Sequence, residues 1–249
     1  MTSTIRYVRN RYQGNLILVL LINSTRKRSS WMLSRQINKI IVDFDGVLID
    51  SNLAFAQEFT TIGNSLTGKE ISIQDIFAVW GGSLHYLLPK FYPEISLAEY
   101  SRERIRQNFH LVTPSVFPGI PKALRQLSKY RKLSMLTNRK SDTLMATMGK
   151  LKINPCLFER IQSSDDSFFN KPHPRVFDDF LVPYRARETL YVGDHHKADY
   201  LPAYGAGIHF VGVLSGGIST REDFLDAGVP KKMILNSLAD LPVRLGIFV

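Results

Sequence analysis

The side chains best suited to chemistry in this sequence each follow a short apolar run directly, or lie in a loop between two such runs. In chain order they are Asp43 and Asp45 after residues 40–42, Thr137 and Asn138 after 133–136, Lys171 in the loop 170–174, and Asp194 and Asp199 after 189–192. A single Asp-x-Asp-Gly sequence would indicate only a turn whose Asp side chains hydrogen-bond the backbone. Polar residues after three separate apolar runs instead favour one shared site.

The apolar runs resemble strands that are buried on both faces of a parallel sheet. The carboxyl ends of parallel strands meet at one edge, where open α/β sheets bind their ligands. Carboxylates gathered there would repel one another, and a hard divalent cation such as Mg²⁺, which prefers oxygen ligands, would relieve the repulsion. Lys171 could supply a fixed positive charge for a phosphate, while Thr137 and nearby backbone amides donate hydrogen bonds. The pattern therefore predicts a Mg²⁺ site that binds a phosphorylated molecule.

Strand-like and helix-like segments alternate along most of the chain, which predicts a doubly wound parallel α/β sheet with a Rossmann-like core. Residues 52–112 break this alternation. They contain helix signals, including capping-box sequences that begin at Ser72 and Ser96, and no strand-like pattern. We therefore expect a core made of residues 33–51 and 113–249, into which 52–112 insert as a small helical domain.

The positive charge of the chain is concentrated at its N-terminus. The 249 residues carry a formal net charge of +10, but residues 1–42 hold eight Lys or Arg and no Asp or Glu, which leaves +2 for the remainder. A nearly neutral body argues against a nucleic-acid partner. We expect residues 1–32 to form a basic extension that is disordered or serves as an organelle transit peptide, unless the native chain starts at Met32.

Several other features limit the function. No run approaches the ~18 apolar residues of a membrane-spanning helix, so no stable membrane insertion is expected. Cys156 is the only cysteine, which excludes an intramolecular disulfide, favours a reducing cytoplasmic compartment and predicts a small buried side chain. His195 and His196 have no Cys or third His placed to complete a zinc site, so they are expected at the surface or behind the site. The Ser215–Gly217 segment is expected to be a flexible connecting loop.

Four of these segments, taken in order, resemble the four motifs of the haloacid dehalogenase-like (HAD) hydrolase superfamily, over roughly residues 38–249. The matching segments are Asp43-Phe44-Asp45-Gly46, Thr137-Asn138, Lys171-Pro172, and Gly193-Asp194 with Asp199. The resemblance implies that Asp43 is a nucleophile that forms an aspartyl-phosphate and that Asp45 is the general acid and base. It further implies that Asp43, the backbone carbonyl of Asp45, and Asp194 hold Mg²⁺. Thr137, Asn138 and Lys171 would bind the phosphoryl group, and Asp199 would orient Lys171 or metal-bound water. One departure is that five rather than four positions separate Asp194 from Asp199.

The resemblance also indicates a branch of the superfamily. Dehalogenases lack the second Asp, so Asp45 favours phosphoryl transfer, and a helical insert after the first motif is similar to the small cap of phosphoglycolate phosphatases, pyrophosphatases and β-phosphoglucomutases. We expect a Mg²⁺-dependent phosphatase of a small phosphorylated metabolite, with a phosphomutase or a non-catalytic binding protein on the same fold as alternatives. His85, Lys90 and Arg104 are candidate cap contacts to substrate, although each would more simply be an exposed helix residue. The sequence does not indicate an oligomeric state.

Overall fold

The computed structural model describes residues 8–9, 16–17, 36–79, 84–109 and 113–247. The chain divides into two compact units, residues 1–35 and 36–249. In the first unit, strand β1 (Val8–Arg9) pairs antiparallel with β2 (Leu16–Ile17). The remainder of the predicted N-terminal extension, including Met32, lies outside the described residues. All further description concerns the second unit.

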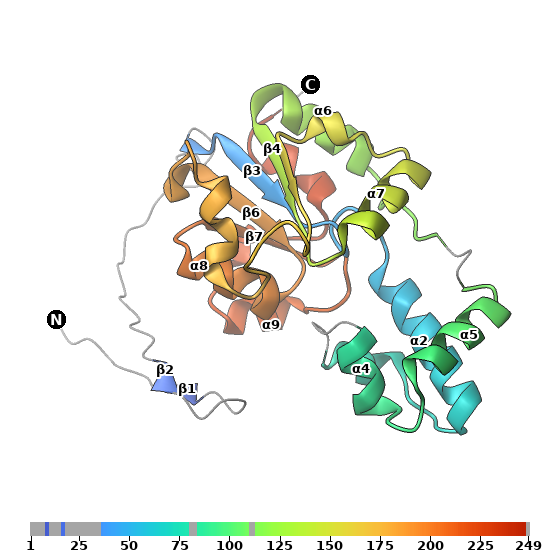
Figure 1. The fold of residues 1–249 in the computed structure, drawn as a ribbon. Helices are drawn as coiled ribbons and strands as arrows, with labels where there is room; N and C mark the ends of the chain where they lie inside the picture. The colour runs from blue at the N-terminus through green and yellow to red at the C-terminus, as the bar shows by residue number, and fades with distance from the viewer. Residues whose placement is uncertain (1–7, 10–15, 18–35, 80–83, 110–112, 248–249) are drawn as a thin grey trace. The chain divides into compact units, whose positions relative to one another are not determined.

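A sheet of six strands in the order β5-β4-β3-β6-β7-β8 forms the centre of the second unit (Figure 1). The strands are β3 (Lys39–Val42), β4 (Lys132–Leu136), β5 (Arg160–Gln162), β6 (Thr189–Gly193), β7 (His209–Val213) and β8 (Ile234–Leu235). All neighbouring strands are parallel. This topology confirms the predicted doubly wound fold. The chain leaves β3 for β4 on one side and later crosses to β6 on the other, so the ligand-binding switch point lies at the end of β3.

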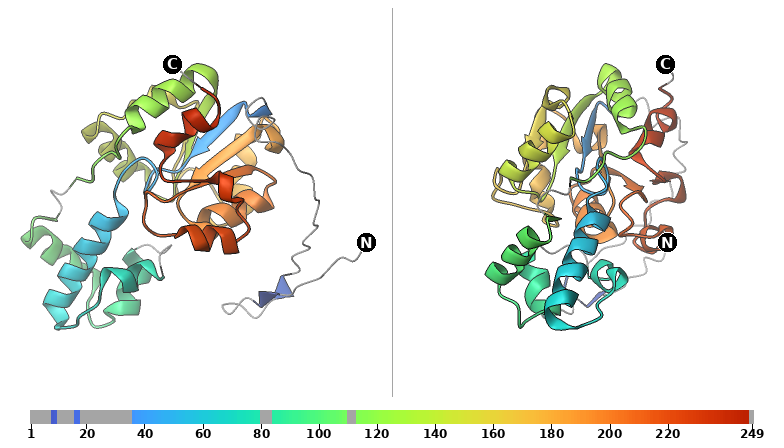
Figure 2. Two further views of the ribbon diagram at one scale, coloured as in Figure 1. Left: turned by 180° about the vertical axis from the view of Figure 1, so that it is seen from behind. Right: turned by 90° about the vertical axis from the view of Figure 1, so that its right-hand side faces the viewer.

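Helices cover both faces of this sheet, as the two views of Figure 2 show. Helix α6 (Ile120–Tyr130) contacts β4, α10 (Leu241–Arg244) and the 3₁₀ turn η7 (Leu238–Asp240). Helix α8 (Leu201–Gly205) contacts the 3₁₀ segment η3 (Pro174–Phe180) and β7. The other elements are α7 (Ser141–Lys150), α9 (Arg221–Asp226), the 3₁₀ turns η2 (Pro155–Leu157), η4 (Ala186–Glu188) and η6 (Lys231–Met233), and the π-helical turn η5 (His196–Tyr200). Helix α7 starts at Ser141 after the N-cap residue Lys140, and residues 174–180 are 3₁₀-helical.

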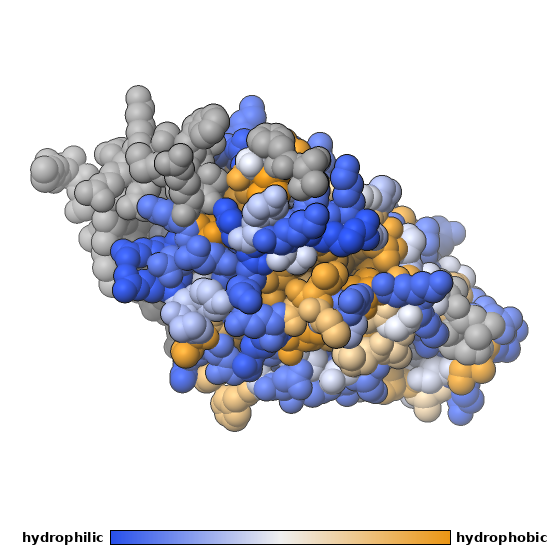
Figure 3. All heavy atoms as spheres, turned by 90° about the horizontal axis from the view of Figure 1, so that it is seen from above, coloured by the Kyte–Doolittle hydropathy of each residue, from blue (hydrophilic) through white to orange (hydrophobic). Residues whose placement is uncertain are grey.

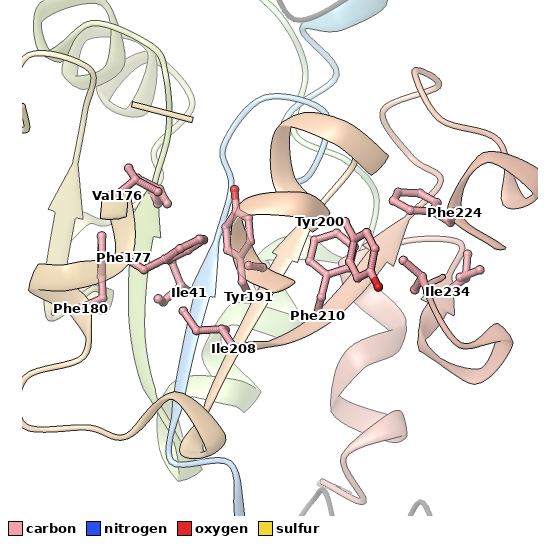
Figure 4. Packing of buried hydrophobic residues seen from close by; sticks show 13 residues of the cluster. Ile41, Val176, Phe177, Phe180, Tyr191, Tyr200, Ile208, Phe210, Phe224 and Ile234 are labelled. Atoms are coloured by element: carbon pink, nitrogen blue, oxygen red, sulfur yellow. The ribbon is translucent and has the colours of Figure 1, made fainter. Parts of the chain in front are cut away.

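The core between the sheet and η3, α8 and α9 is rich in aromatic side chains (Figure 4). Tyr191 of β6 packs against Phe177 and Phe210, with ring centroids 5.0 and 6.0 Å apart. Its side chain is fully buried, and in Figure 4 its hydroxyl points away from the labelled apolar side chains. The packing of the apolar ring therefore fixes the position of this hydroxyl.

Four helices of the described residues follow β3, the first strand of the six-stranded sheet, within residues 52–106. The described part of this segment holds no strand. The helices are α2 (Asn52–Thr67), α3 (Ile73–Phe77), α4 (Leu84–Phe91) and α5 (Leu97–Arg106). Ser72 and Ser96 form the predicted capping boxes at the starts of α3 and α5. The four helices share a hydrophobic cluster around Phe59, whose ring lies 5.2 Å from Tyr92 and 5.9 Å from Tyr100. A cluster of its own is what a small inserted domain requires.

Hydrophilic and hydrophobic residues are intermixed on the face drawn in Figure 3. Among the described residues, no helix combines the length and the apolar character that crossing a membrane would require. The expectation of a buried cysteine was wrong, because Cys156 is exposed. It lies in the short turn η2, next to the capping residue Asn154, where the chain runs along the surface between α7 and β5.

Candidate active site

The candidate site lies where β3 ends. The strand stops at Val42, so Asp43 and Asp45 belong to the following loop and not to a continued strand. Gly46 has a φ of +72°, and a Cβ atom there would overlap the carboxylate of Asp194. Glycine is thus required twice at this position, for the left-handed turn and for the close approach of the two loops. The turn brings the β3 and β6 strand ends together.

Lys171 connects the carboxylates of two loops. Its Nζ donates to Asp43 Oδ2 at 2.6 Å and to Asp199 Oδ1 at 2.7 Å, and it also donates to the hydroxyl of Tyr191 at 3.0 Å. The Lys171 side chain is 5% exposed. A buried ammonium with three oxygen partners is firmly placed, because losing any partner would leave charge uncompensated.

Asp199 accepts four hydrogen bonds. Oδ1 accepts from Lys171 and from the Tyr191 hydroxyl at 2.8 Å, and Oδ2 accepts from the backbone N–H groups of Asp194 at 3.1 Å and His195 at 2.9 Å. The π-helical turn η5 explains how the additional position between Asp194 and Asp199 is accommodated, because a π-turn holds one residue more than an α-helical turn. Asp199 therefore reaches Lys171 despite the longer spacing.

Oxygen atoms of Asp43, Asp194 and Asp199 all lie within 4.8 Å of one another, a grouping that could hold a metal ion. Burial raises the pKa of Asp43 to about 7 although Lys171 acts to lower it. Burial, with the charges of Asp199 and Asp43, raises the pKa of Asp194 well above its ordinary value. Burial acts to raise the pKa of Asp199, but the charge and hydrogen bond of Lys171, together with His195 and the hydrogen bond from Tyr191, lower this pKa overall.

These directions show where positive charge is missing. Asp199 is already neutralised by Lys171, whereas Asp43 and Asp194 are not fully compensated. A divalent cation between the carboxylates of Asp43 and Asp194 would correct this deficit, and their hard oxygen atoms suit such an ion. The residues present therefore fit the metal that the sequence predicts, with Asp199 behind the site. The predicted contribution of Asp45 is its backbone carbonyl, and its carboxylate is not part of the three-residue group.

The end of β4 supplies Thr137 and Asn138. Thr137 is 2% exposed, and its Oγ1 accepts from the N–H of Arg139 at 3.1 Å, which leaves the hydroxyl proton to be donated. The Asn138 amide makes a reciprocal pair with the Lys171 backbone, at 3.0 Å to the carbonyl and 3.1 Å from the N–H. Asn138 thus positions the Lys171 loop, and its predicted contact with substrate stays a prediction.

Sequence reasoning missed four residues of this site: Ser51, Asn52, Arg139 and Tyr191. Ser51 Oγ donates to the Asp45 carboxylate, and Arg139 pairs with the same carboxylate at 2.5 Å. Asn52, the first residue of α2, donates to Asp194 Oδ2 at 2.8 Å. The signals that could have found them are local. Ser51 and Asn52 are polar residues at the start of helix α2, Arg139 follows the second motif, and Tyr191 is a polar residue in a buried strand.

The loop after β7 closes the site against Asp194. Asn52 also donates to the carbonyl of Gly216 at 3.2 Å, and Ser215 donates to the carbonyl of Gly46 at 2.8 Å. A Cβ atom at Gly216 would overlap Asp194, so this loop lies directly against the site. It packs more closely than a simple connecting segment would.

The remaining candidates lie in other surroundings. His195 is buried, and its ring nitrogen accepts from the backbone N–H groups of Lys197 and Ala198 at the start of η5. His196 Nδ1 lies 3.0 Å from the hydroxyl of Ser219. Both histidines therefore support the loops around Asp194.

The structure gives the surroundings of two of the three candidate cap contacts. Arg104 pairs with Glu58 at 2.7 Å. The ammonium of Lys90 lies 5.6 Å from the centroid of the Tyr86 ring. The side chain of His85 lies outside what the structure describes. Their contact with substrate remains a prediction.

Comparison with known proteins places the chain in a family. Residues 40–213 match the family model of the haloacid dehalogenase-like hydrolases, and the chain belongs to this family of hydrolases. A relative named pyrophosphatase PpaX, from Bacillus mycoides (strain KBAB4), is 26% identical over 212 residues, which cover 83% of this chain and 95% of the relative. Haloacid dehalogenase-like hydrolase domain-containing protein 3 of Danio rerio is 37% identical over 92 residues, 35% of this chain and 36% of that protein.

Solved structures agree on the fold. A hydrolase from Pseudomonas syringae superimposes with a TM-score of 0.67 at 24% identity, over 84% of this chain and 98% of that one. The haloacid dehalogenase-like protein ATU0790 of Agrobacterium tumefaciens gives a TM-score of 0.69 at 22% identity, with the same coverage. At these identities the likeness establishes the architecture, and the chemistry has to be argued from the site itself.

Proposed function

We propose that the chain is a Mg²⁺-dependent phosphatase that hydrolyses a small phosphorylated metabolite through an aspartyl-phosphate intermediate. The observation that carries the proposal is the buried Lys171, whose ammonium lies 2.6 Å from Asp43 and 2.7 Å from Asp199. Two unit negative charges repel each other by about 4 kcal/mol at 4 Å in an effective dielectric near 20, and a phosphate dianion repels a carboxylate about twice as strongly. Lys171 stands where it would reduce that repulsion. The pyrophosphatase name of the Bacillus relative supports a phosphorylated substrate.

Each residue then has a role in two successive steps. A carboxylate oxygen of Asp43 forms a bond to phosphorus, the bond from phosphorus to the bridging oxygen breaks, and Asp45 gives that oxygen a proton. Water next attacks the aspartyl-phosphate and gives its proton to Asp45, which releases phosphate and restores Asp43. Lys171 and the hydroxyl of Thr137 hold the non-bridging oxygens. Asp43, Asp194 and the backbone carbonyl of Asp45 would hold Mg²⁺, which when bound neutralises negative charge on the phosphoryl group.

We further propose that residues 52–112 act as a cap over the site and admit only small substrates. Asn52 ties the first helix of this segment to Asp194. A Cβ atom on Gly217 would lie 3.8 Å from the ring of Phe77 in α3, so the segment also reaches the loop after β7. A cap joined so closely to the site would exclude water until the phosphoenzyme forms.

Phosphate release from a panel of substrates tests the proposal. The panel contains phosphoglycolate, pyrophosphate, glucose 6-phosphate and a phosphopeptide, each with and without Mg²⁺. We expect release that depends on Mg²⁺, prefers the small substrates to the phosphopeptide, and falls by more than tenfold in Asp43→Asn, because an amide cannot attack phosphorus. Turnover by Asp43→Asn above about a tenth of wild type would refute the nucleophile. Conversion of β-glucose 1-phosphate to glucose 6-phosphate faster than phosphate release would identify a phosphomutase instead. No turnover of any compound would favour a binding protein.

A further inference from the structure

Asp45, the proposed acid and base, has both carboxylate oxygens engaged. Arg139 Nε donates to Oδ2 at 3.1 Å and Arg139 Nη2 donates to Oδ1 at 2.5 Å, while Ser51 also donates to Oδ1. A guanidinium does not give up its proton in proteins and cannot accept one. Arg139 and Ser51 therefore fill both acceptor sites of Asp45 Oδ1, and Arg139 fills one of the two on Oδ2, so a leaving group has to compete with Arg139 for this carboxylate.

The structure holds the backbone of Arg139 and leaves its side chain within reach of a ligand. Its N–H donates to Thr137 Oγ1 at 3.1 Å, and its carbonyl accepts from the N–H of Ser164 at 3.0 Å. The side chains of Arg139 and Asp45 are 24% and 28% exposed, in contrast to the 5% of Lys171. The guanidinium can thus change partners by side-chain rotation while the loop that carries Thr137 stays in place.

We propose that Arg139 is a specificity-determining residue that recognises a second anionic group on the substrate's leaving group and, by binding it, releases Asp45 for proton transfer. The inference rests on the proposed phosphatase function and adds a substrate class to it. The preferred substrates are phosphate esters or anhydrides with a carboxylate or phosphoryl group one or two atoms beyond the bridging oxygen.

The position of the second anion follows from the hydrogen bonds. Asp45 has to lie within one hydrogen bond of the bridging oxygen in order to protonate it. Arg139 is hydrogen-bonded to Asp45, so its guanidinium lies two hydrogen bonds away from the bridging oxygen. Two consecutive hydrogen bonds span about 5–6 Å, which is the reach of a short carboxylate or phosphoryl leaving group. Arginine also suits such groups, because its planar fork binds carboxylate and phosphate oxygens in pairs.

The exchange explains why a neutral leaving group would be a poor substrate. A leaving group with only hydroxyls has to separate the Arg139–Asp45 ion pair without offering the guanidinium a new anion. A leaving group with its own anion replaces one charge-assisted pair with another. Asp45 can then take a proton from solvent and pass it to the bridging oxygen as that oxygen leaves phosphorus. One charge-assisted contact of this kind changes an equilibrium by about tenfold to hundredfold.

The test uses the full chain and two substrates that differ only in the second anion, phosphoglycolate and 2-hydroxyethyl phosphate. For wild type we expect kcat/KM to be at least tenfold higher for phosphoglycolate. In Arg139→Gln the ratio should fall below about threefold, because phosphoglycolate loses the guanidinium that binds its carboxylate, while 2-hydroxyethyl phosphate no longer has to separate the Arg139–Asp45 ion pair. Circular dichroism and a urea titration establish that the variant is folded.

Arg160→Gln is the matched control. Arg160 pairs with Asp179 at 2.5 Å, the same separation as in the Arg139–Asp45 pair. Arg160 is the first residue of β5, so it lies at the amino end of that strand, whereas the site lies at the carboxyl ends of the strands. This variant loses one positive charge and one ion pair and should keep the wild-type ratio.

Two results would overturn the inference. The first is a wild-type ratio below threefold, which needs no variant at all. The second is an equal fall for both substrates in Arg139→Gln, which would mean that Arg139 only supports the fold. In each case a Mg²⁺-dependent phosphatase would still be present, whereas absence of turnover with all these compounds would refute the proposed function itself.

Discussion

Tyr191→Phe would remove a single oxygen atom from the site and leave the surrounding core intact. The Tyr191 hydroxyl accepts from Lys171 at 3.0 Å and donates to Asp199 at 2.8 Å, while the ring packs between Phe177 and Phe210. Phenylalanine keeps those ring contacts. The substitution therefore measures what the hydroxyl contributes to holding Lys171 in place.

The expected magnitude follows from the partners that remain. Hydrogen bonds to charged groups contribute about 1.5–3 kcal/mol each. After the substitution Lys171 keeps Asp43 and Asp199, and Asp199 keeps Lys171 and two backbone N–H groups. Because no group is left unpaired, we expect the free energy of unfolding to fall by about 1.5–3 kcal/mol in total rather than by twice that amount. If about half of this loss falls on the transition state, kcat/KM should fall by roughly threefold to tenfold.

Urea denaturation followed by circular dichroism gives the stability, and Mg²⁺-dependent phosphate release gives kcat/KM. Tyr200→Phe is the control, because Tyr200 belongs to the same hydrophobic cluster and its hydroxyl takes no part in the Lys171 network. It should change stability by less than about 0.5 kcal/mol and leave turnover unchanged. Wild-type stability and turnover in Tyr191→Phe would show that the carboxylates alone place Lys171. Lower stability with unchanged turnover would show that the hydroxyl stabilises the fold and does not contribute to catalysis.

Two further predictions concern the metal and the N-terminus. Asp194→Ala should raise the dissociation constant of Mg²⁺ by at least tenfold, as measured by isothermal titration calorimetry. The substitution removes one of the two carboxylates whose negative charge is not fully compensated by a neighbouring cation. Unchanged Mg²⁺ affinity, or turnover that survives EDTA, would contradict the metal site. A chain that starts at Met32 keeps the whole compact unit 36–249, so it should retain wild-type turnover and a Tm within about 2 °C, measured by differential scanning calorimetry; a larger loss would show that the first 31 residues stabilise the fold.

Much of the fold could be predicted from the sequence, because its signals are local. Continuous apolar runs such as Ile40–Val42 are the pattern of buried parallel strands, and alternation with helices leaves few other topologies. Capping boxes at Ser72 and Ser96 require only residues three positions apart, and both are present. The convergence of Asp43 and Asp194 also followed from the sequence, since parallel strands end at one edge.

Predictions from local sequence patterns were wrong or incomplete where the structure of a segment depends on residues distant in the sequence. Cysteine is a residue type that is usually buried, but Cys156 lies in a surface turn and is exposed. The spacing between Asp194 and Asp199 was ambiguous until the π-turn η5 showed how the additional residue is accommodated. Burial and exact backbone turns depend on what packs against a segment, which periodicity does not record.

The order of amino acids specifies which polar residues follow which strands, and so which acidic, basic and hydroxyl groups can take part in the site. How these groups pair is visible only in the folded chain. Lys171 lies between Asp43 and Asp199, Asn52 reaches Asp194, and Arg139 holds Asp45. Asp43 and Lys171 are 128 positions apart, and no local pattern encodes their contact. Hydrogen bonds and ion pairs form at about 2.5–3 Å, and these groups reach such distances only when the sheet brings its strand ends together. The pairing leaves the negative charge of Asp43 and Asp194 less fully compensated than that of Asp199, so these are the carboxylates available to a metal ion.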